Sequence, residues 1–196
     1  MEAEQFRWIG KPISRVEDER LMRGAGRYID DLHPFPGCKV AAIVRSPYAH
    51  AYIRNIDVEA ALQIPGVVGV ITGADVRREM RPFPVGVPEP VEYYPMAIDK
   101  VRFVGEPVAV VVADTRYIAE DAAELVQVEY DPLPAVMNAE AATRPESAPL
   151  HENVGSNVAN HRVFSYGEWE QPLKNAPHII SGRFEFPKVT ATPIET

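Results

Sequence analysis

The sequence predicts an α+β fold, in which a small mixed sheet carries packed helices and is followed by an extended linker and strand region. Residues 108–113 are apolar throughout, which is typical of a strand buried on both faces. Residues 117–126 repeat apolar side chains at helical spacing. Residues 51–56 alternate apolar and polar side chains, as a half-buried strand does. Strands and a helix joined by short loops indicate a layered α+β domain.

The composition fits one globular domain with stiff connections. The chain has 196 residues, of which 46% are hydrophobic and 24% are charged, so it can build a core. Its 19 prolines are about twice the usual share of roughly 5%, and many loops must therefore be extended. The net charge of −8, without a basic run, argues against a nucleic-acid partner.

The amino-terminal part is expected to be polar and to lead into a first strand. Residues 1–31 are polar, and Gly24 and Gly26 favour a turn. Residues 38–45 predict a strand. Pro47 is expected to end it, because proline cannot extend a β-ladder.

Short elements are expected after the strand at 51–56. Asp57 is a candidate N-cap for a helix over residues 58–63, because its carboxylate can accept from free amides. Pro65-Gly66 predicts a turn, and residues 67–71 predict a short buried strand closed by Thr72-Gly73. Residues 75–80 favour another brief helix.

A proline-rich loop precedes the central strand, and a helix follows that strand. Residues 81–95 hold five prolines, which indicates a loop with polyproline character. A loop of this length is usually functional or interfacial. Asp114 or Thr115 is expected to cap the helix, and a strand at 127–130 follows it. The apolar positions of the helix fall on one face: Ile118, Ala122, Leu125 and Val126.

The carboxyl-terminal part of the sequence is less regular. Residues 139–149 favour a loop, residues 157–166 contain some alternation, and residues 178–186 predict a strand.

The residues by themselves assign no catalytic, cofactor-binding or metal-binding site. Glu106 could be a catalytic carboxylate, but a solvated or salt-bridged turn residue is the expectation, because no base and nucleophile can be assembled around it. Gly24 and Gly26 lack the third glycine of a nucleotide-binding loop. Trp8 and Trp169 are either interface anchors or core residues.

The histidines and the cysteine predict no metal site. No two histidines have the spacing of a helical metal pair, so they are expected on the surface or in loops. They are His33, His50, His151, His161 and His178. Cys38, the only cysteine, cannot form an internal disulfide or hold an iron–sulfur cluster, and is expected as a small core residue.

A cytoplasmic location is expected. Residues 1–5 are acidic and lack the basic and apolar regions of a signal peptide. No apolar run approaches the roughly 18–20 residues of a membrane span.

Four segments in register resemble a known family. They are residues 10–31, 45–51, 65–75 and 101–126, and they include Arg45-Ser-Pro-Tyr-Ala-His-Ala51 and Pro65-Gly-Val-Val-Gly-Val-Ile-Thr-Gly-Ala-Asp75. Together they are similar to the start of the molybdenum-binding large subunit of the xanthine dehydrogenase and aldehyde oxidase family. The nearest branch is the bacterial one that includes carbon monoxide dehydrogenase. The resemblance covers roughly residues 8–196.

The resemblance implies a domain organisation. Residues 1–17 would be an N-terminal arm, and residues 18–136 would form the a/b hammerhead domain, a mixed α+β unit. Residues 137–196 would be a linker with the first strands of a truncated molybdopterin-binding domain.

The resemblance also implies an activity for a larger assembly. That assembly would be an oxidoreductase that hydroxylates an aldehyde, an N-heterocycle or a related small molecule with water-derived oxygen. Molybdopterin, in its cytosine dinucleotide form, and a glutamate base would lie in the rest of the large subunit, and iron–sulfur clusters and FAD on partner subunits. This segment would give scaffold and subunit contacts, and the isolated chain would be inactive. The Gly-Glu-Pro at Glu106 lies in the hammerhead, so the base role does not fall on it.

Two alternatives stay open beside this interpretation. One is a stand-alone hammerhead-type binding or assembly module without catalysis, which would have a polar surface. The other is a small independent enzyme that uses Glu106 or a histidine. A segment of a larger subunit predicts instead a large exposed apolar patch where further domains dock.

Overall fold

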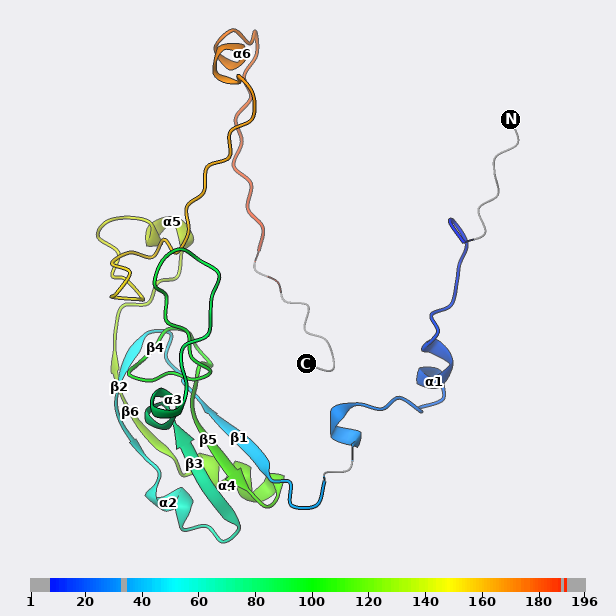
Figure 1. Ribbon diagram of the computed structural model, residues 1–196, viewed down its shortest axis with the longest axis vertical. Coiled ribbons are helices and arrows are strands. Elements are labelled where there is room, and N and C mark those ends of the chain that lie inside the picture. Colours follow the sequence, from blue (N-terminus) through cyan, green and yellow to red (C-terminus); the bar gives the residue numbers. More distant parts are fainter. Residues whose placement is uncertain (1–7, 33–34, 188, 190–196) are drawn as a thin grey trace. The chain divides into compact units, whose positions relative to one another are not determined.

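In the computed structural model, which describes residues 8–32, 35–187 and 189, the chain divides into two units (Figure 1). One unit is Cys38–Pro177 and contains two three-stranded antiparallel sheets. The other combines Met1–Gly37 with His178–Thr196. None of the described helices combines the length and the apolar character that crossing a bilayer requires. The predicted α+β class is confirmed, with two small sheets in place of one.

The first sheet has the order β1-β5-β3. Its members are β1 (Val40–Arg45), β5 (Pro107–Ala113) and β3 (Val67–Thr72). The central strand β5 is flanked on both sides, and most of its side chains are buried, as its apolar sequence predicts. The prediction of a buried strand at 67–71 is right about the strand and wrong about its burial. Strand β3 lies at the sheet edge, and its Val68 is 59% exposed.

The second sheet has the order β4-β2-β6. It is formed by β4 (Lys100–Val101), β2 (Ala51–Asp57) and β6 (Gln127–Pro132). The predicted strands at 51–56 and 127–130 are confirmed, whereas the two-residue β4 has no pattern of its own in the sequence. Strands β5 and β6 therefore belong to different sheets, although only one helix separates them in the chain.

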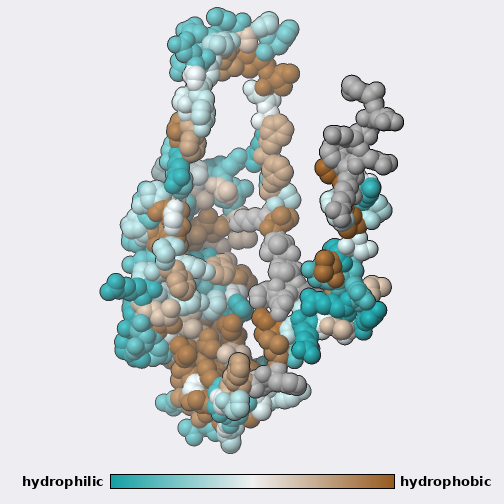
Figure 2. Space-filling view, turned by 45° about the vertical axis from the view of Figure 1, so that its right-hand side comes forward, coloured by the Kyte–Doolittle hydropathy of each residue, from teal (hydrophilic) through white to brown (hydrophobic). Residues whose placement is uncertain are grey.

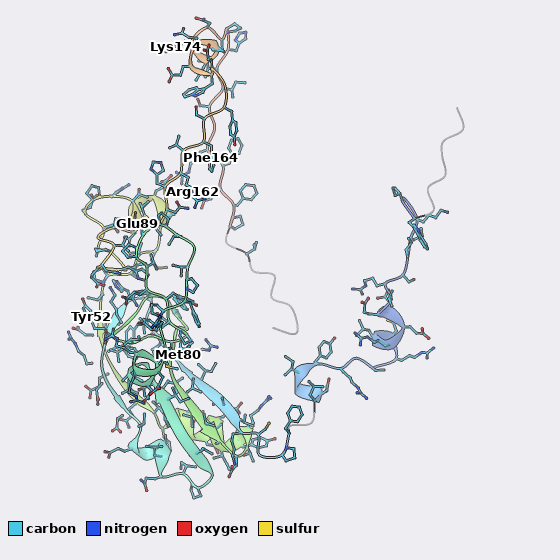
Figure 3. The ribbon with its side chains drawn as sticks, viewed as in Figure 1. Tyr52, Met80, Glu89, Arg162, Phe164 and Lys174 are labelled. Carbon is cyan, nitrogen blue, oxygen red and sulfur yellow. The ribbon has the colours of Figure 1, made fainter. Side chains whose placement is uncertain are left out.

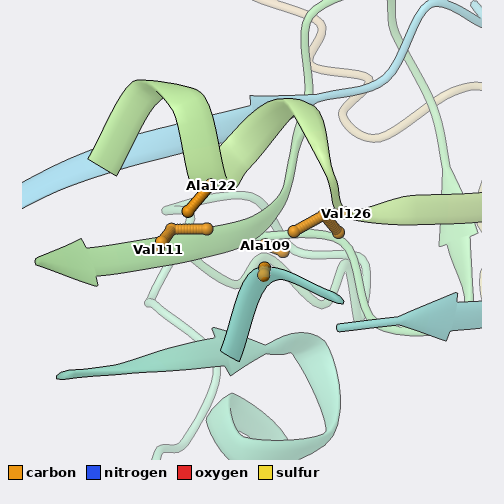
Figure 4. Packing of buried hydrophobic residues seen from close by; sticks show 5 residues of the cluster. Ala109, Val111, Ala122 and Val126 are labelled. Carbon is orange, nitrogen blue, oxygen red and sulfur yellow. The ribbon is translucent and has the colours of Figure 1, made fainter. Parts of the chain in front are cut away.

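Helix α4 (Arg116–Glu124) packs on β1 and β5. Its Ala122 is fully buried, and Figure 4 shows it beside Val111. Thr115 is the N-cap, with its side chain accepting from the Ile118 amide at 3.3 Å. The expected burial of Leu125 is wrong, because the helix ends at Glu124 and Leu125 is 39% exposed.

Two short helices flank β3. Helix α2 (Glu59–Leu62) has Val58 as its N-cap, so the prediction of Asp57 as the cap is one residue off. The Asp57 carboxylate still accepts from the Glu59 amide at 2.9 Å. Helix α3 (Gly73–Glu79) begins earlier than predicted, because Thr72 and Asp75 form a capping box there.

The loops after the sheets differ in part from the predictions. The proline-rich stretch 81–95 contains no helix or strand, as expected. The predicted loop over 139–149 contains α5 (Ala139–Ala142), whose first turn is capped by Asn138. Helix α6 (Glu170–Lys174) was not predicted either. Both helices are four or five residues long, too short to leave a periodic signal in the sequence.

The second unit contains short helical elements and an extended stretch. They are α1 (Asp18–Met22), the 3-10 helix η1 (Ile29–Asp31) and residues 178–187. The prediction of a strand at 178–186 is wrong, because these residues form no β-bridge. The turn at Gly24 is confirmed by its positive φ of 67°.

Candidate functional site

A pocket of about 290 Å³ lies in the Cys38–Pro177 unit around β4. Its wall combines the end of the proline-rich loop at 92–94, the stretch 96–106, and Leu150 with His151. The loop is folded back on itself there, since the Phe83 amide donates to the Tyr93 carbonyl at 2.7 Å and their rings lie 6.1 Å apart. The proline-rich loop therefore has a definite place as one wall of this pocket.

Glu106 is buried in a tight turn at the pocket, with 8% of its surface exposed. Its carboxylate accepts from the backbone amide of Arg102. Its own backbone carbonyl accepts from the Ser46 amide at 2.9 Å. Burial raises the pKa of the Glu106 carboxyl, against the opposing hydrogen bond and charge of Arg102. The expectation of a solvated turn residue is wrong, because this carboxylate satisfies an amide inside the turn.

Lys100 and Arg102 fasten the later loop to β4. The Lys100 side chain is only 3% exposed and its ammonium lies 2.5 Å from the Glu152 carboxylate. The Arg102 guanidinium donates to the carbonyls of Leu150, at 3.0 Å, and Lys100, at 3.1 Å. Both basic side chains are therefore engaged within the unit.

The local environment biases two of the titratable groups of the pocket, His151 and Glu106, towards their neutral forms. Burial lowers the pKa of His151, and the positive charges of Arg102 and Lys100 lower it further. Burial shifts the pKa of the Glu106 carboxyl in the opposite direction and raises it.

Helix α3 closes one side of the pocket through Arg77. Its guanidinium pairs with the Asp99 carboxylate at 2.6 Å. The helix start lies so close to the backbone of residues 97 and 98 that a Cβ on Gly73 would come within 2.2 Å of the Ala97 oxygen. Only glycine allows this approach.

This geometry contains no catalytic set. No serine, threonine or cysteine lines the pocket, and Arg77, Arg102 and Glu106 already have partners within the chain. Among the described residues, no group of three or more histidine, cysteine or acidic side chains could hold a metal ion.

The structure brings only two of the sequence candidates together, namely Glu106 and His151 at the pocket. His50 lies in the bend before β2, which the expectation of a loop histidine includes, but it is buried there, with Nδ1 2.8 Å from the Pro134 carbonyl. His161 and His178 are exposed, and His33 lies outside the described residues.

The remaining candidates are exposed, and one ion pair beside the pocket was missed. Cys38 is exposed, so the prediction of a core cysteine is wrong. Trp8 and Trp169 are 59% and 55% exposed, which excludes the core interpretation. The Lys100–Glu152 pair was missed, because 52 residues separate its members and neither has a local motif.

Large apolar side chains are exposed over residues 163–186. Figure 3 labels Phe164 on the stretch between α5 and α6, and this side chain is 72% exposed. Ile180 and Phe186 are 96% and 92% exposed. Soluble monomers rarely expose such residues in a continuous segment, so this part of the chain has the composition of an interface.

The fold and the pocket thus define a small α+β structural module that also exposes apolar segments with the composition of an interface. A family model described as aldehyde oxidase and xanthine dehydrogenase, a/b hammerhead domain, matches residues 23–134. The chain belongs to this family.

Relatives of known activity align with nearly the whole chain. The nicotine 6-hydroxylase large subunit of Paenarthrobacter nicotinovorans is 37% identical over 96% of this chain and 23% of its own length. The structure of quinoline 2-oxidoreductase from Pseudomonas putida 86 matches with a TM-score of 0.82 at 40% identity, over 95% of this chain and 24% of that one. The structure of a Cu,Mo-CO dehydrogenase matches with a TM-score of 0.66 at 37% identity, over 81% and 20%. The chain therefore spans about a quarter of the length of these relatives.

Proposed function

We propose that the chain is the N-terminal portion of the large subunit of a molybdenum hydroxylase and acts there as scaffold and as a source of subunit contacts. The observation that carries this proposal is the family match over residues 23–134 in a chain that spans about a quarter of its relatives.

The proposed assembly is an oxidoreductase that hydroxylates a small molecule with water-derived oxygen. Two of the relatives are named for nicotine and quinoline, which supports an N-heterocycle as the substrate class, and an aldehyde is the second choice. The molybdenum cofactor, in its molybdopterin cytosine dinucleotide form, is held by the rest of the subunit. Iron–sulfur clusters and FAD lie on partner subunits, and the assembly works in the cytoplasm.

The proposed domain boundaries follow the family resemblance. Residues 1–17 form an arm, residues 18–136 form the hammerhead, and residues 137–196 lead into the first strands of the molybdopterin-binding domain. The exposed side chains at Phe164, Ile180 and Phe186 support this last assignment, because they suit strands that pair within a further domain.

Co-purification tests the proposal. The chain is tagged at its own locus, purified with the products of neighbouring genes, and assayed for molybdenum, iron and flavin. We expect molybdenum in about equimolar amount to the chain. A purified complex without molybdenum would contradict the proposal, as would a chain that never leaves the monomer fraction.

A stand-alone binding module is the alternative. The Cys38–Pro177 unit has a hydrophobic core of its own, and this observation favours the alternative. Such a module should have a polar surface, whereas residues 163–186 expose large apolar side chains. Binding of a hydrophobic dye separates the two. Strong binding by the folded isolated chain supports the larger subunit, and negligible binding supports the module.

A further inference from the structure

Two neighbouring rows of residues on the outer face of the β1-β5-β3 sheet are apolar. Residues that pair directly in antiparallel strands point to the same face. Ile43 pairs with Val110, and Val110 pairs with Ile71. The neighbouring row has the same character, and consists of Ala41, Val112 and Gly69. We call these six residues the outer apolar face.

Only the opposite face of this sheet is covered by the unit itself. There Ala109 and Val111 of β5 pack with Ala122 of α4 in one core cluster (Figure 4). On the outer apolar face, Ile43 and Ile71 are 46% and 43% exposed. Figure 2 shows hydrophobic surface over the end of the unit where β1, β3 and β5 lie. The central strand β5 therefore has the apolar sequence of a strand that is buried on both faces, although the unit itself covers only one of its faces.

The second sheet shows what a solvated outer face looks like in this chain. Tyr52, labelled in Figure 3, pairs with Lys100 and with Asp131, so the three share a face. Arg54 forms an ion pair with Asp131, and Lys100 pairs with Glu152. The second sheet thus presents the charged Arg54 and Asp131 to solvent, whereas the first presents six residues without a polar side chain.

We infer that the outer apolar face is a docking surface for the rest of the large subunit, namely the chain that accounts for about three quarters of the relatives' length. This inference rests on the proposed function. An interface without polar groups resembles a domain core cut in half, which is typical of permanent contacts.

Site-specific photo-crosslinking identifies the occupant. Benzoylphenylalanine replaces Ile43 or Ile71 in the chain expressed from its own locus, and the cross-linked peptides are sequenced after irradiation. The control position is Asn55, exposed on the charged sheet. We expect cross-links from both test positions to the remainder of the large subunit, within the same polypeptide or in a companion one, and none from Asn55. Cross-links to a second copy or to another subunit, or no cross-link, overturn the inference.

The molybdenum content of the same preparation separates this inference from the proposed function. If molybdenum is present and the cross-links lead elsewhere, the docking surface is wrong while the proposed function stands. If molybdenum is absent, the proposed function fails.

Substitutions give an independent measurement. Ile71→Lys should lower the yield of the molybdenum-containing complex by about tenfold or more, as the loss of one buried contact does. Asn55→Lys should leave that yield unchanged. Ile71→Thr retains β-propensity and should give an intermediate loss, with the thermal unfolding of the chain close to wild type. Equal yields for Ile71→Lys and Asn55→Lys overturn the inference.

Discussion

Gly73 is the residue on which the approach of α3 to the pocket depends. Its missing Cβ would lie 2.2 Å from the Ala97 oxygen and 2.7 Å from the Ile98 Cα, both of them backbone atoms that cannot turn aside. We expect Gly73→Ala to lower the free energy of unfolding by about 1–3 kcal/mol, the usual cost of overpacking. Urea denaturation measures it. Gly69→Ala is the matched control, because nothing lies within 4 Å of its added Cβ. An equal effect of both substitutions would contradict the steric argument.

Glu106 gives the chain a pH dependence whose sign can be derived. Because burial raises the pKa of the Glu106 carboxyl in the folded state above its ordinary value, the protonated carboxyl contributes stability that is fully present at pH values below that ordinary pKa. It is lost as the pH rises through the raised folded pKa. Glu106→Gln stays neutral and still accepts from the Arg102 amide. We therefore expect the stability of the variant relative to wild type to increase from pH 4 to about pH 7.

Urea denaturation of both proteins at a series of pH values checks this expectation. Comparing the two chains at each pH cancels the other titrating groups, including His151, whose lowered pKa acts in the opposite direction. If the difference in stability between the variant and wild type is constant, or falls as the pH rises, burial does not destabilise the charged form of Glu106.

Single residues were predictable where their role is local. The cap at Thr115 and the turn at Gly24 follow from chemistry within a few positions of the chain. The burial of His50 and the Lys100–Glu152 pair could not be predicted, because each depends on segments that meet only after folding. Glu106 was recognised as a candidate, but its environment depends on a turn that local sequence does not define.

At the scale of elements, local periodicity predicted helix α4 and every strand of the two sheets except β4, but not the pairing of the strands. The alternation in β2 and the apolar run in β5 are properties of the segments themselves. Their division into two sheets depends on register between distant strands. Residues 178–186 have a strand-like pattern but form no strand, since such a pattern forms a strand only when a partner supplies hydrogen bonds.

The N-cap of α4 is worth testing because this helix covers the sheet core. Thr115→Ala removes the acceptor of the Ile118 amide, and we expect a loss of about 1 kcal/mol in the free energy of unfolding. Thr115→Ser keeps the hydroxyl and should retain most of the stability. Circular dichroism during thermal unfolding measures both. A Thr115→Ser chain as unstable as Thr115→Ala would show that methyl packing, and not the cap, matters.

At the scale of the whole molecule, the loop at 150–157 fastens the linker to the hammerhead. Leu150 accepts from Arg102, and Glu152 pairs with Lys100. Asn157 closes this loop, since its side chain accepts from the Leu150 amide at 2.8 Å and donates to the Ala148 carbonyl at 3.1 Å. The first part of the proposed linker is therefore a structural component of the folded unit and one wall of its pocket.

Two truncated chains test how far this folded unit extends. A chain of residues 38–160 keeps every contact of the 150–157 loop with β4 and should unfold at nearly the same temperature as the full chain. A chain ending at residue 136 loses the Lys100–Glu152 pair and the partner of Arg102, and should be less stable. Glu152→Gln in the longer chain isolates the ion pair. Because Glu152 is 55% exposed, we expect it to cost about 1 kcal/mol or less. Differential scanning calorimetry gives all three values. If the chain ending at 136 matches the longer one, the loop contributes nothing to the fold and the hammerhead is complete without it.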